Sequence, residues 1–271
     1  MGAAVGACAV KRGHRVLWAS AGRSGATVQR ARAAGLEDGG SMEQAMQGCA
    51  VVLSVCPPHG ALALARAVAK TGFKGIYLDA NAVSPETTRE VGRIVGAAGA
   101  HFVDGGIIGG PPQPDAPTRL YVCGEDGGAI ADVFADSPVR VLPLAGPIGA
   151  ASALKACYAA WTKGTIALAA NIRALAVHED VDRELVEVWT AQQPDALKRC
   201  DQISPTARKA WRWVHEMEEI AASFEAAGLP DGFHLASADL YARLGDFKDA
   251  ATPPPAGEVL EAVIEAGKGP D

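Results

Sequence analysis

The residue best suited to catalysis in this sequence is Lys155, which lies among alanines and other small residues. A glycine-rich segment at residues 146–149 precedes it, and Ser152 lies one turn before it on the same side of a predicted helix. Desolvation by apolar neighbours favours the neutral amine of a lysine, which can then accept and donate a proton. We therefore predict that Lys155 is a general acid/base. The alternative is a surface lysine whose stem lies along an amphipathic helix.

Paired glycines form a second candidate site at residues 105–111. Gly109 and Gly110 lie in this segment, which follows a predicted strand at residues 101–104. Because glycine has no side chain, its backbone amide can approach an anionic group closely. We predict that Gly109 and Gly110 contact the substrate together with Lys155, although a plain glycine-rich turn would show the same pattern.

Two more segments follow predicted strands of a parallel sheet, and ligands of such sheets bind in the crevice at the carboxyl ends of the strands. The first segment supplies Val55, Cys56 and Pro57, which we predict to contact a cofactor. The second supplies Asn81, whose amide can bond a carboxamide or a carboxylate, so we predict contacts from it to both cofactor and substrate. The alternative for Asn81 is capping of the following helix, for which Ser84 is better placed.

The loop at residues 18–24 follows another predicted strand and contains no acidic residue. In sheets that bind a dinucleotide, an acid at this place bonds the ribose 2′-hydroxyl of NAD. Ser20, Arg23 and Ser24 instead offer hydroxyl groups and a cation, which suit a 2′-phosphate. We therefore favour NADP over NAD as the cofactor bound by these three residues, with a solvated loop as the alternative.

The first half of the chain alternates between short apolar runs and helical stretches. The predicted strands are residues 15–18, 51–56, 76–79, 101–104, 120–123 and 140–142. The predicted helices between them include residues 27–34, 60–70 and 85–98. Strands that alternate with helices require crossover connections and a parallel sheet. We therefore predict an α/β domain at residues 1–145, with a Rossmann-like doubly wound parallel sheet.

The second half of the chain shows only helical patterns. A long helix is predicted at residues 150–178, and shorter helices at residues 180–190, 206–227, 232–244 and 257–266. Gly228 and Pro230 end one of them, because glycine adopts the left-handed turn and proline cannot continue a helix. We therefore predict an all-α domain at residues 146–271, which begins with a long interdomain helix.

In this order, the segments around the strand ends and Lys155 resemble the β-hydroxyacid dehydrogenase and 6-phosphogluconate dehydrogenase superfamily. They are also similar to a divergent bacterial branch of it with a distinctive helical carboxy-terminal domain, over nearly the whole chain. The resemblance implies that Lys155 transfers the proton of a hydroxyl or carbonyl group while a hydride moves to or from a nicotinamide. Ile108 and Ala159 stand where hydroxyacid dehydrogenases carry serine and asparagine, which argues against an ordinary hydroxyacid substrate.

The amino-terminal residues resemble the end of the superfamily's G-x-G-x-x-G fingerprint, whose amides hold the pyrophosphate of the dinucleotide. Gly2 matches the third glycine, and Gly13 with His14 match the end of the first helix. The resemblance therefore implies that Gly2 binds the cofactor. It also leads us to expect that the chain begins inside the fingerprint, without the first strand and the first two glycines.

The composition of the chain limits the classes of molecule that it can bind. A net charge of −6 with mixed acids and bases argues against nucleic acid, which needs a basic surface. No apolar run approaches the roughly 20 residues of a membrane span, and no signal peptide is evident, so we expect a cytoplasmic protein. The cysteines and histidines lack metal-ligand spacing, so we expect no metal. A small-molecule substrate is expected, and the resemblance together with the long apolar helix implies a homodimer.

These observations predict an NADP-dependent oxidoreductase that acts on a small carboxylate-bearing alcohol, carbonyl compound or imine. The alternative is a non-catalytic truncated remnant, a dimeric small-molecule-binding protein, because a sheet without a central strand exposes edges and apolar surface. Binding of NADPH or NADH would separate the two hypotheses.

Overall fold

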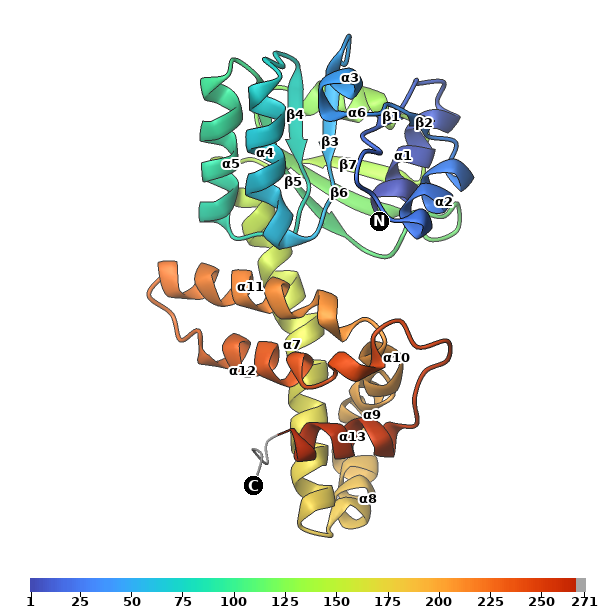
Figure 1. The fold of residues 1–271 in the computed structure, drawn as a ribbon. Helices are drawn as coiled ribbons and strands as arrows, with labels where there is room; N and C mark the ends of the chain where they lie inside the picture. The colour runs from blue at the N-terminus through green and yellow to red at the C-terminus, as the bar shows by residue number, and fades with distance from the viewer. Residues whose placement is uncertain (267–271) are drawn as a thin grey trace. The chain divides into compact units, whose positions relative to one another are not determined.

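The computed structural model describes residues 1–266 and divides into two compact units, Met1–Ala156 and Cys157–Asp271. The first unit combines sheets with helices, and the second consists of helices (Figure 1). The last five residues of the predicted helical domain, 267–271, lie outside the described part of the chain. The predicted boundary between residues 145 and 146 precedes the long helix, whereas the division by contacts falls inside it.

The first unit is built on a five-stranded sheet with the order β3-β4-β5-β6-β7. Its strands are β3 (Val51–Ser54), β4 (Ile76–Asp79), β5 (His101–Ile108), β6 (Thr118–Cys123) and β7 (Val139–Pro143). The pairs β3–β4, β4–β5 and β6–β7 are parallel, and β5–β6 is antiparallel. The register of β4 with β5 pairs Asp79 with Asp104. The predicted Rossmann-like sheet is thus confirmed, with one antiparallel pair within it.

Helices lie on both faces of this sheet, as a doubly wound fold requires. They are α1 (Gly2–Lys11), α2 (Gly25–Ala33), α3 (Met42–Met46), α4 (Ala61–Lys70), α5 (Pro85–Ala97) and α6 (Gly127–Val133), with the 3₁₀ turn η1 (Pro58–Gly60). One apolar cluster joins Val5 of α1 and Ile130 of α6 to Val103 of the sheet. A second cluster joins Val68 of α4 and Val91 of α5 to the other side. In Figure 1, α4 and α5 lie side by side.

Two short strands, β1 (Leu17–Trp18) and β2 (Glu37–Asp38), form a separate parallel two-stranded sheet. The loops that follow them are joined by hydrogen bonds from the amides of Ser20 and Ala21 to the carbonyl oxygen of Gly40. The carboxyl ends of β1 and β2 are therefore held together, so that residues after both strands can contribute to one site.

Local sequence explains the helix starts that matter for the site. The hydroxyl of Ser84 accepts a hydrogen bond from the amide of Thr87 at 3.1 Å, and Pro85 occupies the first helical position of α5. Ser84, and not Asn81, therefore caps α5, as the sequence predicts. Val91 and Val95 then face the core one turn apart, with 0% exposure each.

The second unit is all helical. The long helix α7 (Ala150–His178) has the predicted bounds, runs on from the first unit and is 29 residues long. It is followed by α8 (Asp182–Gln192), α9 (Pro194–Cys200), α10 (Ile203–Ala207), η2 (Ala210–Arg212), α11 (Val214–Ala226), α12 (Gly232–Ala242), η3 (Gly245–Phe247) and α13 (Ala256–Glu265). In the described residues, no helix is long and apolar enough to cross a membrane.

A buried ion pair lies in this helical unit. Lys163 of α7 pairs with Glu216 of α11, and the Lys163 ammonium lies 5.1 Å from the centre of the Trp213 ring. The hydroxyl of Tyr241 donates to the carbonyl oxygen of Lys163 at 2.7 Å. These contacts fix α7 against α11 and α12 by directional interactions within an otherwise apolar packing.

Several sequence expectations differ from the structure. The helix predicted at residues 206–227 is broken into α10, η2 and α11, because α10 ends at Ala207 and α11 begins only at Val214. The strand predicted at residues 101–104 continues to Ile108, because its glycines pair with β6 in the antiparallel ladder. The short elements β2, α3, α6 and α9 were absent from the prediction, since each is too short to show a clear period.

At the end of β4, Asp79 is 2% exposed, and its Oδ2 has no hydrogen-bond partner among the described residues. Burial, aided by the nearby Asp104, raises the pKa of Asp79 from 3.8 to about 7. In the unfolded chain the group loses its proton near its ordinary pKa. Between about pH 4 and pH 7, folding therefore takes up a proton, and the free energy of unfolding falls as pH rises.

Replacement of Asp79 by asparagine keeps an acceptor oxygen and removes this titration. Between pH 4 and pH 7, we expect the free energy of unfolding to fall less in Asp79→Asn than in the wild type. The difference between the two decreases should be up to about 4 kcal/mol. Urea unfolding of both proteins at pH 5 and pH 7.5 measures the difference. Equal changes of unfolding free energy in the two proteins would show that Asp79 does not titrate in this range.

Candidate functional site

Lys155 lies in the second turn of α7, and the first turn of this helix is held by a carboxylate of the sheet. Asp104 of β5 accepts hydrogen bonds from the amides of Gly149 at 2.8 Å and Ala151 at 2.9 Å. It also accepts from the amide of Ser152 at 3.2 Å and from the Ser152 hydroxyl at 2.6 Å. The start of α7 thus lies against β5, where its unpaired amides find an anionic acceptor.

Gly106 marks the place where α7 touches the sheet. A Cβ atom at Gly106 would lie 2.5 Å from the carbonyl oxygen of Ala151 and 3.3 Å from the Cβ of Lys155. The absence of a side chain at this position therefore allows the close approach. Because Gly106 lies two residues past Asp104, where the β4–β5 pairing ends, Lys155 is placed just beyond the carboxyl end of the parallel strands.

Asn81 joins the segments that follow β3 and β4. Its Oδ1 accepts from the amide of Cys56 at 2.6 Å, and its Nδ2 donates to the hydroxyl of Ser54 at 2.8 Å. Its own amide donates to Asp79 at 2.8 Å, and the residue is 3% exposed. The side chain is thus engaged by the protein, and its predicted contact with a cofactor or substrate stays a prediction.

The predicted cofactor residues around β3 lie close to one another. A Cβ atom at Gly2, the first residue of α1, would lie 3.2 Å from the carbonyl oxygen of Val55. Burial raises the pKa of the Cys56 thiol to about 11, and the positive charge of Arg23 acts in the opposite direction. Cys56 is therefore a protonated thiol at neutral pH. The structure thus brings together Gly2, Val55, Cys56 and Arg23. Pro57 directly precedes η1.

An acid on β2 lies against the loop after β1, and sequence reasoning missed this contact. Ser20 donates its hydroxyl to Asp38 of β2, and Asp38 also accepts from the amide of Gly40 at 2.9 Å. The bond from Ser20 is the main reason that the pKa of Asp38 lies below its ordinary value. Ser24 caps α2 by accepting from the amide of Thr27 at 3.4 Å. Arg23 is thus the exposed cation of this loop.

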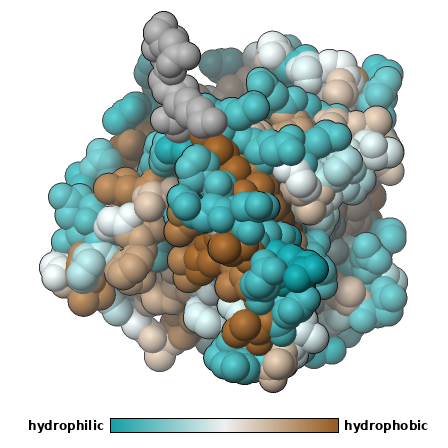
Figure 2. Space-filling model, turned by 90° about the horizontal axis from the view of Figure 1, so that it is seen from below, coloured by the Kyte–Doolittle hydropathy of each residue, from teal (hydrophilic) through white to brown (hydrophobic). Residues whose placement is uncertain are grey.

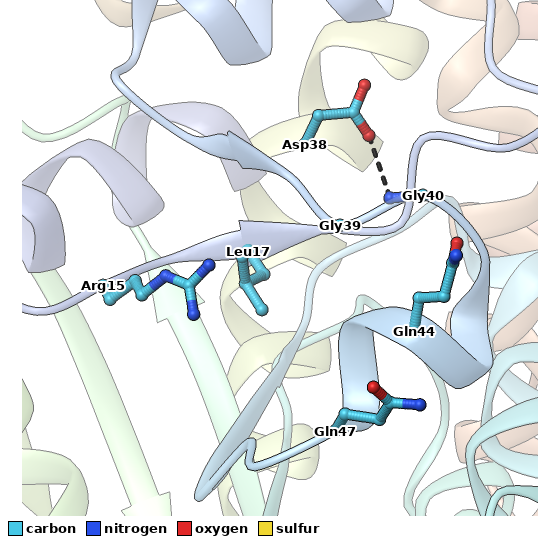
Figure 3. A pocket seen from close by; sticks show the side chains of 7 residues that line it. All are labelled: Arg15, Leu17, Asp38, Gly39, Gly40, Gln44 and Gln47. Atoms are coloured by element: carbon cyan, nitrogen blue, oxygen red, sulfur yellow. Dashed lines mark hydrogen bonds between the residues drawn. The ribbon is translucent and has the colours of Figure 1, made fainter.

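A pocket adjoins this loop, and its lining residues come from three segments (Figure 3). They are Arg15, Leu17, Asp38, Gly39, Gly40, Gln44 and Gln47. Figure 3 shows the bond between Asp38 and Gly40, with Gln44 on the helix α3 that follows and Gln47 directly after that helix. None of the lining residues is a predicted site residue, and the connection to the predicted site is the contact of Asp38 with Ser20.

Gly109 and Gly110 follow the last residue of β5 and are exposed. Gly109 has a φ of 120°, a conformation that favours glycine, and the carbonyl oxygen of Gly110 accepts from the hydroxyl of Thr118 at 2.5 Å. Their amides remain predicted substrate contacts.

Sequence reasoning named the segments that hold Asp104 and Gly106 but assigned these residues no role. The sequence signal for Asp104 is a carboxylate at the end of a predicted strand, followed about 45 residues later by a glycine-rich start of a helix. The contact itself depends on the pairing of β5 in the sheet, which one-dimensional spacing does not show.

Comparison with known families agrees with this architecture. Residues 1–133 match the family profile of the NAD binding domain of 6-phosphogluconate dehydrogenase. Residues 176–244 match a domain of unknown function, DUF1932. No curated protein sequence gives a significant match to the chain.

Many solved structures share the fold. One is a conserved protein of unknown function described as structurally similar to 3-hydroxyacid dehydrogenases, with 25% identity, coverage of 90% of this chain and 93% of that one, and a TM-score of 0.63. Another is the 3-hydroxyisobutyrate dehydrogenase of Mycobacterium tuberculosis, with 19% identity, coverage of 97% and 95%, and a TM-score of 0.69. A reductive aminase of Aspergillus terreus has 16% identity, coverage of 96% and 95%, and a TM-score of 0.55.

The sheet with helices on both faces and the family match of residues 1–133 indicate the same kind of domain, and the solved structures named above share the fold of the chain. The chain therefore carries an NAD-binding domain of the 6-phosphogluconate dehydrogenase type followed by a DUF1932 domain, in a fold that it shares with NAD(P)-dependent oxidoreductases of the 3-hydroxyacid dehydrogenase type.

Proposed function

We propose that this protein is an NADP-dependent oxidoreductase that acts on a small carboxylate-bearing alcohol, carbonyl compound or imine, with Lys155 as general acid/base. The proposal rests on the position of Lys155, which packs against Gly106 just past the carboxyl end of the parallel strands of an NAD-binding domain. Ligands of open α/β sheets bind at this edge.

The residues at the strand ends suit a dinucleotide. The first turn of α1 contains no acidic side chain, and Gly2 at its start lies against Val55, so backbone amides can face a phosphate without a side chain between them. When bound, the nicotinamide supplies or accepts the hydride. The chain's own contribution is to bind the dinucleotide with the residues around β1 and β3 and to move a proton at Lys155.

The preference for NADP rests on Arg23. Ser20 is engaged with Asp38, and Ser24 caps α2, which leaves the guanidinium of Arg23 as the group of this loop best suited to a 2′-phosphate. The carboxylate of Asp38 disfavours a phosphate near Ser20, so the contribution of Arg23 decides between the two nucleotides.

We infer the substrate class from Lys155 itself and from the glycines that follow β5. The exposed amides of Gly109 and Gly110 suit a carboxylate, and Lys155 can protonate the oxygen or nitrogen that gains the hydride's electrons. Ile108 is 9% exposed and offers no hydroxyl donor, so an imine or a carbonyl compound that needs no serine contact fits the site as well as an alcohol does.

We further propose a homodimer through α7. Six side chains of this helix follow a heptad pattern with alternating spacings of three and four residues: Tyr158, Trp161, Thr165, Leu168, Ile172 and Leu175. Trp161, Leu168 and Leu175 are 65%, 58% and 62% exposed. Figure 2 shows apolar side chains gathered in one area of the face drawn there, between hydrophilic ones. A second copy would remove such a stripe from water.

The cofactor preference is tested by Arg23→Ala. Loss of one charge-assisted contact with a 2′-phosphate should weaken NADPH binding roughly 10- to 100-fold and leave NADH binding within about twofold. Titration followed by nicotinamide fluorescence measures both. Arg66→Ala, which removes an exposed arginine of α4, serves as the matched control and should change neither. Equal weakening for both nucleotides would contradict the assignment to the 2′-phosphate.

The proton-transfer role is tested by Lys155→Ala. A panel of small oxo acids, alone and with added amines, is first screened for oxidation of NADPH by the wild type. With the best substrate, Lys155→Ala should lower turnover at least about 100-fold, the usual scale for a general acid/base, while NADPH still binds. Lys70→Ala, at the exposed end of α4, should retain activity. Undiminished turnover in Lys155→Ala would remove Lys155 from this role.

The dimer is tested by the double variant Leu168→Asp and Leu175→Asp. Charges in the stripe of α7 should convert a particle of twice the chain mass into one of single mass, as measured by light scattering of the eluted protein. Leu229→Asp, at a residue that is 53% exposed outside α7, should leave the dimer intact. A wild-type protein of single mass would contradict the proposed dimer.

A further inference from the structure

Asp104 differs from ordinary helix caps in where it comes from. A typical capping residue directly precedes its helix, as Ser84 does for α5. Asp104 instead lies on a central strand, 45 residues before Gly149 in the chain, and is 0% exposed. Its carboxylate is the acceptor for four donors in the entry and first turn of α7. The position of this turn is therefore set by the sheet.

A second contact reaches the same turn from α5. The hydroxyls of Ser152 and Thr88 lie 2.7 Å apart, and both residues are buried. Ser152 thus connects the carboxylate of β5 to a helix on the sheet. The first turn of α7 is held from two directions by groups that have no exposure to water.

These contacts determine where Lys155 lies. Ala151 and Ser152 precede Lys155 by four and three residues, so the three residues share one side of the helix. The capped turn and Lys155 are separated by roughly 5 Å of helix rise, and a helix transmits a shift of its first turn directly over this length. Gly106 of β5 sets how closely Lys155 can approach the strand. Because glycine has no Cβ, the backbone of α7 and Lys155 can pack directly against the strand at this position.

The charges around Asp104 are consistent with this role. Asp79, its partner in the register of β4 and β5, has a pKa raised by burial to about 7. Burial also raises the pKa of Asp104, and the hydrogen bonds from Ser152, Ala151 and Gly149 oppose this rise. The donors of α7 thus favour the anion at Asp104, whereas Asp79 has fewer donors to stabilise a charge.

We propose that Asp104 is the positioning residue of Lys155, acting through Ser152 and the first turn of α7, and that Gly106 is the strand position that fixes the depth of the lysine. The importance of this positioning for catalysis rests on the proposed function of Lys155. The placement of the amine itself does not depend on that function and can be measured without a substrate.

The test uses Asp104→Asn in the full chain, which puts an amide donor in place of one carboxylate oxygen. Ser152→Ala is a milder variant that keeps the carboxylate and removes the hydroxyl bonds to Asp104 and Thr88. Asp132→Asn, an exposed acid of α6, is the matched control. Circular dichroism and thermal unfolding establish that each variant is folded at the temperature of the assay.

The main readout is the rate of acetylation of each lysine by trace acetic anhydride between pH 6 and pH 10, followed by mass spectrometry of peptides. We expect the ratio of the Lys155 rate to the Lys163 rate, and its dependence on pH, to change at least about threefold in Asp104→Asn. Ser152→Ala should show a smaller change in the same direction, and Asp132→Asn should match the wild type. Unchanged ratios in folded Asp104→Asn would overturn the proposal.

Two further outcomes separate positioning from general stability. A uniform rise in the reactivity of all lysines would indicate only a looser fold and would overturn the proposal. With an active substrate, Asp104→Asn should lower kcat roughly 10- to 100-fold with KM within about twofold, as expected for a displaced catalytic group. If Lys155→Ala retains full turnover, the proposed function fails, while the acetylation ratios still decide whether Asp104 positions Lys155.

Discussion

The bonds between Asp104 and the first turn of α7 are the interaction on which the arrangement of the candidate site depends. A helix begins with amides that have no partner in the helix itself, and here a buried carboxylate of β5 accepts from them. An ionised group without partners would be costly at this depth, and amides without acceptors would be equally unfavourable. The carboxylate of Asp104 and the amides of α7 therefore stabilise each other. Their bonds fix the position of the first turns of α7, which contain Lys155, relative to the sheet.

The neighbouring polar network shows how the rest of the crevice is held. Asn81 bonds to Ser54 and Cys56 after β3, and its own amide bonds to Asp79 at the end of β4. Two adjacent buried carboxyl groups cannot both carry a charge at low cost, and their environments separate their behaviour. The donors of α7 favour the anion of Asp104, whereas the pKa of Asp79 is about 7. The strand ends are thus joined by hydrogen bonds as well as by the sheet.

The long helix α7 carries different chemistry along its length. Its first turns place Lys155 against Gly106 of the sheet, and further on Lys163 forms a buried pair with Glu216. A buried ion pair adds little net stability, because desolvation offsets the attraction, but it disfavours arrangements that would separate the charges. In the helical unit, Lys163 therefore contributes to the specificity of packing, whereas Lys155 is the residue that we propose for proton transfer.

Much of the fold could be predicted from local patterns, because hydrophobic periodicity and helix-end residues act over a few neighbouring positions. The bounds of α7, the strand β4 and the cap of α5 by Ser84 are determined in this way. The extension of β5 to Ile108, the contact of Ser20 with Asp38 and the role of Asp104 were decided by the tertiary structure. Each depends on strand pairing or on a bond between residues far apart in the chain, and such contacts form only when the sheet has brought them together.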